Sequence, residues 1–303
     1  MDKTFISERF QELQDEICST LQEADGKLIF KEDLWERPNG GGGKTRIGKE
    51  GSVIEKGGVN FSAVHGKTPE KILKALKLEE ADFFATGVSI VLHPFNPFVP
   101  IIHMNIRYFE MSNGTYWFGG GIDLTPHYII EKDAVFFHAM LKRVCDEADN
   151  SFYPKFKTWA DDYFFIKHRN ETRGIGGIFF DRLNENSTRK NKSELFDFVF
   201  NVGKTFCPIY VELMKRNRDS SFEDHHKKWQ KLRRGRYVEF NLVLDKGTKF
   251  GLDTNGRTES ILMSLPPQAH WDYDHIPEEN SKEEKSLKLL KKGIDWVNFE
   301  VNA

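Results

Sequence analysis

The stretch from Phe83 to Asp123 constrains the fold more than any other part of the chain. It is rich in Val, Ile, Phe and Tyr, and prolines and a Ser112-Asn113-Gly114 turn divide it into short runs. An Asn-Gly pair between two such runs is typical of a tight β-hairpin. We therefore predict three strands here, the last two antiparallel: Thr86–Leu92, Ile101–Met111 and Thr115–Ile122.

Helical patterns flank this block on both sides. Ile6–Leu21 places apolar residues three and four positions apart, which indicates an amphipathic helix, and Thr68-Pro69-Glu70 is typical of a helix start. We predict further helices over 131–147, 153–167, 194–215, 222–232 and 283–292, and further strands over 176–183, 237–244 and 260–265. Hairpin-joined strands and blocks of helices favour an α+β fold with a mainly antiparallel sheet. No linker divides the chain, so we expect one domain, residues 1–303.

Charge and composition exclude several classes of protein. The 303 residues carry 44 Lys and Arg against 46 Asp and Glu, so no overall positive field attracts nucleic acid. Aromatic residues make up 13% of the chain, which argues against disorder. A basic cluster from Lys227 to Arg236 has a helical pattern, so we interpret it as a solvated helix face. We expect no nucleic-acid partner.

The sequence also bears on compartment. Cys18, Cys145 and Cys207 are widely spaced and form no Cys-x-x-Cys motif, so we expect neither a disulfide framework nor a cysteine-based zinc site. The longest apolar stretch, around Phe83–Leu92, falls short of the ~20 residues of a membrane-spanning helix. The first residues match neither a signal peptide nor a transit peptide. We therefore expect no integral membrane segment and a cytoplasmic location.

A glycine run, Asn39–Gly43, predicts a loop that either moves freely or lets the backbone approach a ligand or partner closely. Lys44-Thr45 follows it, which gives it some likeness to a nucleotide-binding phosphate loop. That motif needs a glycine where this chain has Pro38, so we do not expect nucleotide binding. Gly40–Gly43 is also a candidate lid.

The predicted strand over 101–111 alternates between polar and apolar residues, so its two faces differ. One face carries His103, Asn105 and Arg107, and the residues between them are apolar. Ser89 and His93 likewise share a face of the preceding strand. Such a polar row either lines a pocket or faces solvent, and the spacing alone leaves both interpretations open.

Four histidines are candidate ligands of a divalent metal: His93, His103, His138 and His168. Their spacing matches no ligand motif, so hydrogen-bonded or packing histidines are the alternative.

Two further stretches combine glycine with charge. Gly119–Pro126 ends a predicted strand in backbone that a ligand could approach, and Asp123 would be an acceptor beside the His103 strand. Arg257 stands in the turn Asn255–Glu259, where it either holds a carboxylate in a forked pair or lies on the surface.

Taken together and in order, these stretches resemble the oxygen-dependent coproporphyrinogen III oxidases, over about Arg37 to Tyr273. Each block alone could arise by chance, whereas their ordered co-occurrence is specific. Phe95, Ile102 and Asn255 depart from the family's pattern and affect only details of substrate contact. The matching blocks are Gly41-Gly42-Gly43, Glu55–Ser62, Gly87-Val88-Ser89, His93-Pro94, Asn96-Pro97, His103–Phe109, Trp117–Pro126, Lys167–Glu171, Arg173–Gly177, Gly235–Asn241 and Arg257–Ser264.

The resemblance implies a large, rather flat antiparallel sheet with helices on both faces, in a homodimer formed through about residues 237–271. It implies oxidative decarboxylation of two propionates of coproporphyrinogen III to vinyl groups, which yields protoporphyrinogen IX in haem biosynthesis. O2 is the acceptor and no organic cofactor is implied. By position, His103 is the proton donor. Some members are described with a divalent metal at the four histidines, and others without one. The implied substrate contacts are Ser89, Asn105, Ile106, Arg107, Asn255, Gly256 and Arg257.

The residues themselves suit such a substrate, a flexible reduced tetrapyrrole with four carboxylates. Arg107 and Arg257 can bind carboxylates, Asp123 can accept from pyrrole N–H groups, and the many Phe residues can form apolar walls. His103 can transfer a proton near neutral pH. We therefore expect catalytic roles for His103, Arg107 and Asp123. Two alternatives stay open: a metal-dependent oxygenase or hydrolase that uses the four histidines, and a non-catalytic tetrapyrrole-binding protein.

Overall fold

One antiparallel sheet of seven strands organises the part of the chain that the computed structural model describes, residues 1–68, 73, 81–253 and 256–301. The strand order is β1-β2-β3-β4-β5-β6-β9, so most neighbours in the sheet are also neighbours in the chain. A separate hairpin of β7 (Phe165–Ile166) and β8 (Glu171–Thr172) precedes β9. The strands of the main sheet are β1 (Phe30–Glu36), β2 (Gly41–Lys49), β3 (Ile54–Lys67), β4 (Asp82–Pro94), β5 (Ile101–Met111), β6 (Tyr116–Thr125) and β9 (Gly177–Leu183).

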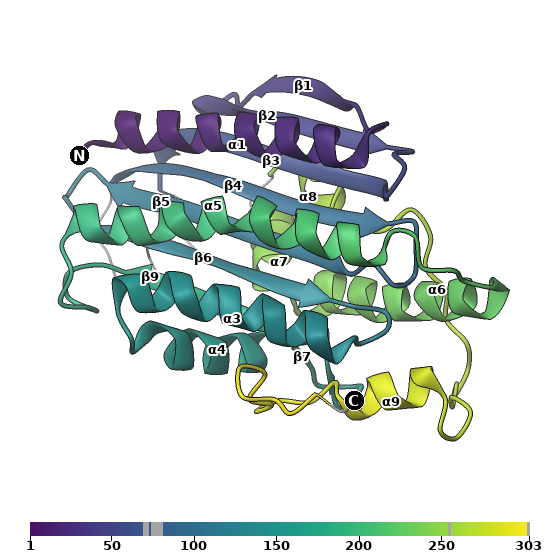
Figure 1. Cartoon of the computed structure of the whole chain (residues 1–303). Coiled ribbons are helices and arrows are strands. Elements are labelled where there is room, and N and C mark those ends of the chain that lie inside the picture. The colour runs from purple at the N-terminus through teal and green to yellow at the C-terminus, as the bar shows by residue number, and fades with distance from the viewer. Residues whose placement is uncertain (69–72, 74–80, 254–255, 302–303) are drawn as a thin grey trace.

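Three long helices lie across one face of this sheet, which we call the helix-covered face (Figure 1). A fourth, α4 (Phe152–Tyr163), packs against β9. Side-chain caps fix where two of the long helices begin: Asp2 accepts from the Phe5 amide, and Asn191 forms a capping box with Glu194. The long helices are α1 (Lys3–Asp25), α3 (Glu131–Ala148) and α5 (Lys192–Asn217).

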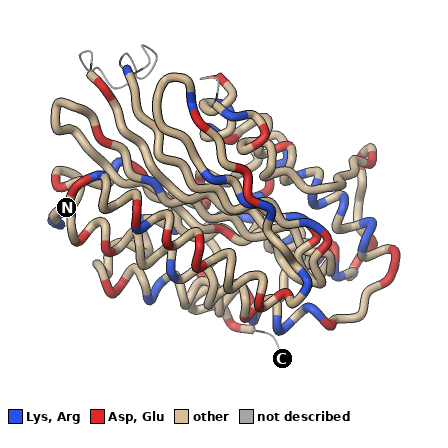
Figure 2. The backbone as a smooth tube through the Cα atoms, turned by 90° about the horizontal axis from the view of Figure 1, so that it is seen from above, with Lys and Arg blue, Asp and Glu red and all other residues tan. Residues whose placement is uncertain are grey.

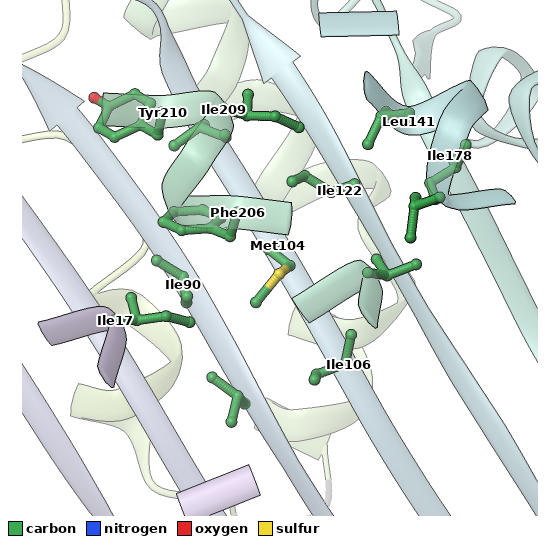
Figure 3. Close-up of a cluster of buried hydrophobic side chains, with 14 of the residues drawn as sticks. Ile17, Ile90, Met104, Ile106, Ile122, Leu141, Ile178, Phe206, Ile209 and Tyr210 are labelled. Carbon is green, nitrogen blue, oxygen red and sulfur yellow. The ribbon is translucent and has the colours of Figure 1, made fainter. Parts of the chain in front are cut away.

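The main hydrophobic core lies between these helices and the sheet. Figure 3 shows Ile90, Met104 and Ile122 on the strands beneath Phe206 and Ile209 of α5. All five side chains have no exposed surface. Fully burying a side chain of this size stabilises the fold by roughly 1.5–3 kcal/mol, so this face carries much of the stability.

Shorter C-terminal elements cover part of the opposite face, which we call the open face. They lie behind the sheet in Figure 1. Tyr237 packs on Val91 and Ile101, and the hydroxyl groups of Thr45 and Ser260 are 2.9 Å apart. A last helix, α9 (Lys282–Lys288), lies below the sheet near the C-terminus (Figure 1). The covering elements are α6 (Asp224–Glu239), the π-helix η1 (Phe240–Leu244), α7 (Lys246–Asp253) and α8 (Thr258–Leu262). The α+β prediction with helices on both faces is thus confirmed.

Two of the predicted strands are wrong. Residues 237–244 end α6 and form η1, and residues 260–265 lie in α8 and the turn after it. Their aromatic and β-branched residues match a strand pattern, but Arg233, Arg234 and Tyr237 form one buried side of a continuing helix. The helix predicted over 153–167 ends at Tyr163. Pro69 and Glu70, part of a predicted helix start, lie outside the described residues.

The prediction for the glycine run is wrong for three of its five residues, because only Asn39 and Gly40 lie in the turn before β2. Gly41, Gly42 and Gly43 belong to β2 and pair with both β1 and β3, so they form neither a free loop nor a lid. A Cβ atom on Gly43 would lie 2.3 Å from the Trp35 ring, so glycine leaves the space that the indole fills. Strands β1 to β3 were not predicted.

Charged residues of both signs are interspersed along the helices (Figure 2), as the near-neutral net charge leads one to expect. Within the described residues, none of the helices has the length and apolar character needed to span a membrane.

Candidate active site

A row of polar side chains crosses the centre of the open face. Ser89 of β4 pairs with Asn105 of β5, which pairs with Gly121 of β6. His103 and Arg107 lie two residues to either side of Asn105 and share its face, because the residues between them are fully buried on the helix-covered face. The prediction that these side chains share one face is confirmed. That face is the open face, which the C-terminal elements cover only in part.

His103 lies opposite Asp123 in the β5–β6 pair, and its Nδ1 donates to the Asp123 carboxylate over 2.7 Å. The other carboxylate oxygen accepts from Arg173 Nη2 over 2.6 Å. Asp123 and Arg173 are buried, whereas the His103 side chain is 24% exposed. Because Nδ1 is turned to Asp123, Nε2 is the ring atom that can exchange a proton with a ligand.

The Asp123 carboxylate stays ionised although it is buried. Burial raises its pKa, but the charge of the Arg173 guanidinium and the hydrogen bond from His103 together hold the pKa below its usual value. An ionised Asp123 keeps the Nδ1 proton of His103 in place and fixes the direction of the ring.

Arg173 was not among the predicted site residues. It comes from the loop after β8, 50 positions from Asp123, and its Nη1 donates to Asn241 of η1 over 2.8 Å. Its guanidinium lies 4.4 to 4.8 Å from three aromatic ring centres, those of Phe164, Tyr237 and Phe240. The one sequence signal was the glycine-rich block after Arg173, which brings the chain against β6: a Cβ on Gly174 would lie 2.1 Å from the Leu124 carbonyl oxygen.

Arg107 lies flat on the sheet between two partners. Its Nη2 donates to Asp181 of β9 and its Nη1 to Asn105, each over 2.8 Å. A Cβ atom on Gly119 would lie 2.7 Å from Asp181 Oδ1 and 2.8 Å from Arg107 Nε, so a larger residue there would push the pair away from the strand. The side chains of Arg107 and Asp181 are 38% and 32% exposed, so a ligand can reach both.

A β-bulge places Asp181 beside Arg107. Between two successive pairs of the β6–β9 ladder, β6 contributes Gly119 while β9 contributes both Asp181 and Arg182. Arg182 has φ 53°, and a non-glycine residue in the left-handed region costs on the order of 1 kcal/mol. A part-exposed ion pair returns at most about 1 kcal/mol. The ion pair can therefore at most offset the cost of the left-handed residue, and the bulge sets where Asp181 lies.

Arg257 lies at the other side of the open face. It donates to Asp33 of β1, and its guanidinium lies 6.0 Å from the Trp35 ring centre. Strands β1 and β5 are four strand spacings apart, about 19 Å, and Ser260 of α8 contacts Thr45 of β2 and Asn60 of β3 between them. Gly256 directly precedes Arg257, and Asn255 lies outside the described residues.

Ile106 differs from the other predicted substrate contacts. Its side chain is fully buried on the helix-covered face (Figure 3), so a ligand on the open face could meet only its backbone.

A model of the family "Coproporphyrinogen III oxidase" matches residues 5–296. The chain belongs to this family. It is 49% identical to the chloroplastic oxygen-dependent coproporphyrinogen-III oxidase of Glycine max, over 97% of this chain and 80% of the relative. It is 50% identical to the Drosophila melanogaster enzyme of that name, over 94% and 76%, and to the mitochondrial one of Homo sapiens, over 97% and 67%. The family resemblance is thereby confirmed.

The comparison contradicts the expected cytoplasmic location. The coproporphyrinogen oxidases of soybean and tobacco are named chloroplastic, and those of rat and human mitochondrial. These names point to an organelle. The expectation rested on the absence of a recognisable targeting pattern near Met1.

The four histidines implied as metal ligands of the coproporphyrinogen oxidase family do not meet in one site. His138 lies in the core with both ring nitrogens occupied: Nδ1 accepts from Tyr153 Oη over 2.9 Å and Nε2 donates to the Ile175 carbonyl over 3.0 Å. Burial lowers the His138 pKa to about 3, so the ring is neutral.

The other three histidines have separate partners. His93 Nε2 donates to the Ser264 carbonyl over 2.8 Å, and His168 pairs with Glu239 over 2.9 Å in an exposed position. His103 is held by Asp123. Across the described ranges, His, Cys, Asp and Glu form no cluster of three that could hold a metal ion. The residues do not fit the implied metal, so the prediction of a four-histidine site is wrong.

Proposed function

We propose that this chain catalyses the oxidative decarboxylation of coproporphyrinogen III to protoporphyrinogen IX, with O2 as the acceptor, in haem biosynthesis. The match to the coproporphyrinogen oxidase family over residues 5–296 supports this activity. The observation that carries it is the chain from Arg173 through Asp123 to His103, which ends at a part-exposed imidazole on the same face as Arg107.

The balance of the reaction defines what the protein must supply. Each propionate gives up a hydride equivalent from the carbon next to the pyrrole, and the electron pair of the breaking bond to CO2 forms the vinyl group. O2 takes the hydride equivalent and one proton and leaves as H2O2. A porphyrinogen is electron-rich enough to meet O2 directly, so the protein must orient the propionate and handle the proton.

His103 is the proton-transfer group in this proposal, acting at Nε2. Asp123 acts as a positioning residue, because both its oxygens are engaged by His103 and Arg173. This arrangement favours an orienting role for Asp123 over direct acceptance of hydrogen bonds from pyrrole N–H groups. Arg173 holds Asp123 and ties it to Asn241 of η1.

The open face provides the substrate contacts. Arg107 binds a propionate, with Asn105 and Ser89 beside it on neighbouring strands. At the far side, Gly256 and Arg257 form a second carboxylate-binding region. Asn255, which lies outside the described residues, is a further proposed contact. Backbone atoms of Ile106 complete the set.

We further propose that the chain works as a single domain, residues 1–303, in a homodimer, without an organic cofactor. The segment 237–271 supports a dimer because it exposes apolar side chains. These are Leu242, Val243, Phe250, Leu252 and Trp271. Light scattering of the purified chain should give twice its 35.2 kDa mass.

O2 uptake with coproporphyrinogen III tests the function, using protein treated with chelator and assayed for metals. We expect uptake with formation of vinyl groups and H2O2 in a one-to-one ratio. Turnover only after adding a divalent ion would keep the substrate and show that the reaction needs a metal. Tight binding of coproporphyrinogen without O2 uptake would favour the non-catalytic tetrapyrrole-binding protein.

A further inference from the structure

Each of the two arginines assigned to carboxylate binding is already paired with a carboxylate of the protein. Arg107 donates to Asp181 and Arg257 donates to Asp33, at opposite sides of the open face. Neither aspartate is buried: their side chains are 32% and 50% exposed. An arginine paired with a part-exposed aspartate thus occurs at both sides of the open face, which suggests that the two pairs have the same role.

We propose that Asp181 is an internal competitor for Arg107, which holds the guanidinium in place until a substrate propionate displaces it. This inference rests on the proposed role of Arg107 in propionate binding. Asp181 acts through Arg107, so it is a positioning and specificity-determining residue.

The geometry around Gly119 supports displacement by a ligand carboxylate. Arg107 Nη1 is held by Asn105, so loss of Asp181 does not release the guanidinium from the sheet. The Nη2 hydrogen that now points to Asp181 is thereby presented to an incoming carboxylate. Because Asp181 belongs to a bulge whose next residue, Arg182, has φ 53°, its position is set by the backbone and it can pair again when the ligand leaves.

The consequence is selectivity for a carboxylate that belongs to a larger, tightly bound molecule. The Arg107–Asp181 pair is nearly neutral, so a small anion gains little free energy by binding to it. A propionate on a tetrapyrrole is delivered by the binding of the whole macrocycle and so competes at a high effective concentration. The displaced Asp181 then opposes the bound carboxylate and shortens its stay.

Binding of coproporphyrin III, the stable oxidised and fluorescent form of the substrate, tests this directly. Asp181→Asn keeps an oxygen acceptor for Arg107 but removes the competing charge. We expect it to lower the Kd for coproporphyrin III about fivefold, the upper range for a part-exposed ion pair. The KM for coproporphyrinogen III should fall by a similar factor, with kcat changed by less than about twofold.

Two matched controls make the result specific. Asp162→Asn removes the same charge from an exposed ion pair with Lys292 on α4, outside the open face, and should leave the Kd unchanged. In an Arg107→Ala background, Asp181→Asn should tighten binding by much less, because no guanidinium is left for Asp181 to compete for. Asp181→Ser serves as a second variant with the same expected direction, should the amide disturb the bulge.

An unchanged or higher Kd in both Asp181 variants would overturn the proposal. So would an equal tightening in the Arg107→Ala background, or a fall in kcat at constant KM. The proposed function can fail separately. If wild-type protein takes up no O2, but Asp181→Asn still tightens coproporphyrin binding through Arg107, then the competition stands and the oxidase function is wrong. Normal oxidase activity with silent Asp181 variants would do the reverse.

Discussion

The two faces of the sheet are built in opposite ways from the same strands. Toward α1, α3 and α5, β5 presents apolar side chains with no exposed surface. Toward α6 and α7 it presents His103, Asn105 and Arg107, which are partly exposed and held by hydrogen bonds. Large apolar side chains fill the helix-covered face. The open face carries charged side chains, and glycines beneath them leave room for those side chains. Because side chains alternate along a strand, each residue that packs in the core is the direct neighbour in the chain of a residue on the site's face.

His103→Ala should have the largest effect and should act on the open face alone. Loss of proton transfer should lower kcat by roughly 10²- to 10⁴-fold. The free energy of unfolding should fall by about 1–3 kcal/mol, because the buried Asp123 carboxylate loses a hydrogen-bond donor, although His103 lies outside the hydrophobic core. Single-turnover O2 uptake and calorimetry measure both. An unfolded variant would show that the two faces are not separable here.

The neighbours Ile106 and Arg107 test the comparison within one strand. Ile106→Ala should lower the free energy of unfolding by about 2–5 kcal/mol, because a buried side chain is lost from the core. Arg107→Ala should lower it by at most about 1 kcal/mol. Denaturant titration of the two variants gives both values.

Activity should show the reverse order for the same pair. Arg107→Ala should reduce kcat/KM at least about tenfold, because a propionate loses its charged partner. Folded Ile106→Ala protein should keep kcat/KM within about threefold of wild type. Equal losses in both variants would mean that the faces act as one unit.

Acidification should lower the stability of the protein through its buried histidines. Burial holds the pKa of His93, His127 and His138 well below the usual 6.5, so these rings stay neutral when folded but take up protons when unfolded. The unfolded state binds more protons below pH 6.5, so stability is present above that pH and is lost as pH falls. For His138, whose pKa in the folded protein is about 3, the free energy of unfolding should fall by about 2 kcal/mol at pH 5.

His138→Gln provides the check on that effect, with urea unfolding measured at pH 7 and pH 5. The loss of stability between the two pH values should shrink by about 2 kcal/mol relative to wild type. An unchanged difference would exclude His138 as a neutral buried ring.

The sequence predicts the centre of the molecule better than its edges. Alternation over 101–111 and the Asn113-Gly114 turn are local signals, and they place His103, Asn105 and Arg107 on one face. Asp123 follows because it lies in the next strand of the hairpin. The family motifs add Arg257 but give no partner for it.

The remaining site features depend on contacts between distant segments, which local patterns do not encode. Arg173 meets Asp123 across 50 positions, and Asp181 meets Arg107 across 74 through a bulge. The four histidines were grouped by residue type and by the family resemblance, and neither shows that His138 lies in the core. The strand pattern of 237–244 was overridden because α6 continues as a helix against the sheet.

The order of the strands has a consequence for how the chain is made. Because β1 to β6 each pair with the strand just synthesised, they can form hairpin by hairpin as the chain leaves the ribosome. Strand β9 joins β6 only after α3 and α4 have emerged. A nascent chain that stops before β9 therefore carries Arg107 without Asp181, and Arg107 gains this carboxylate partner only when β9 completes the sheet.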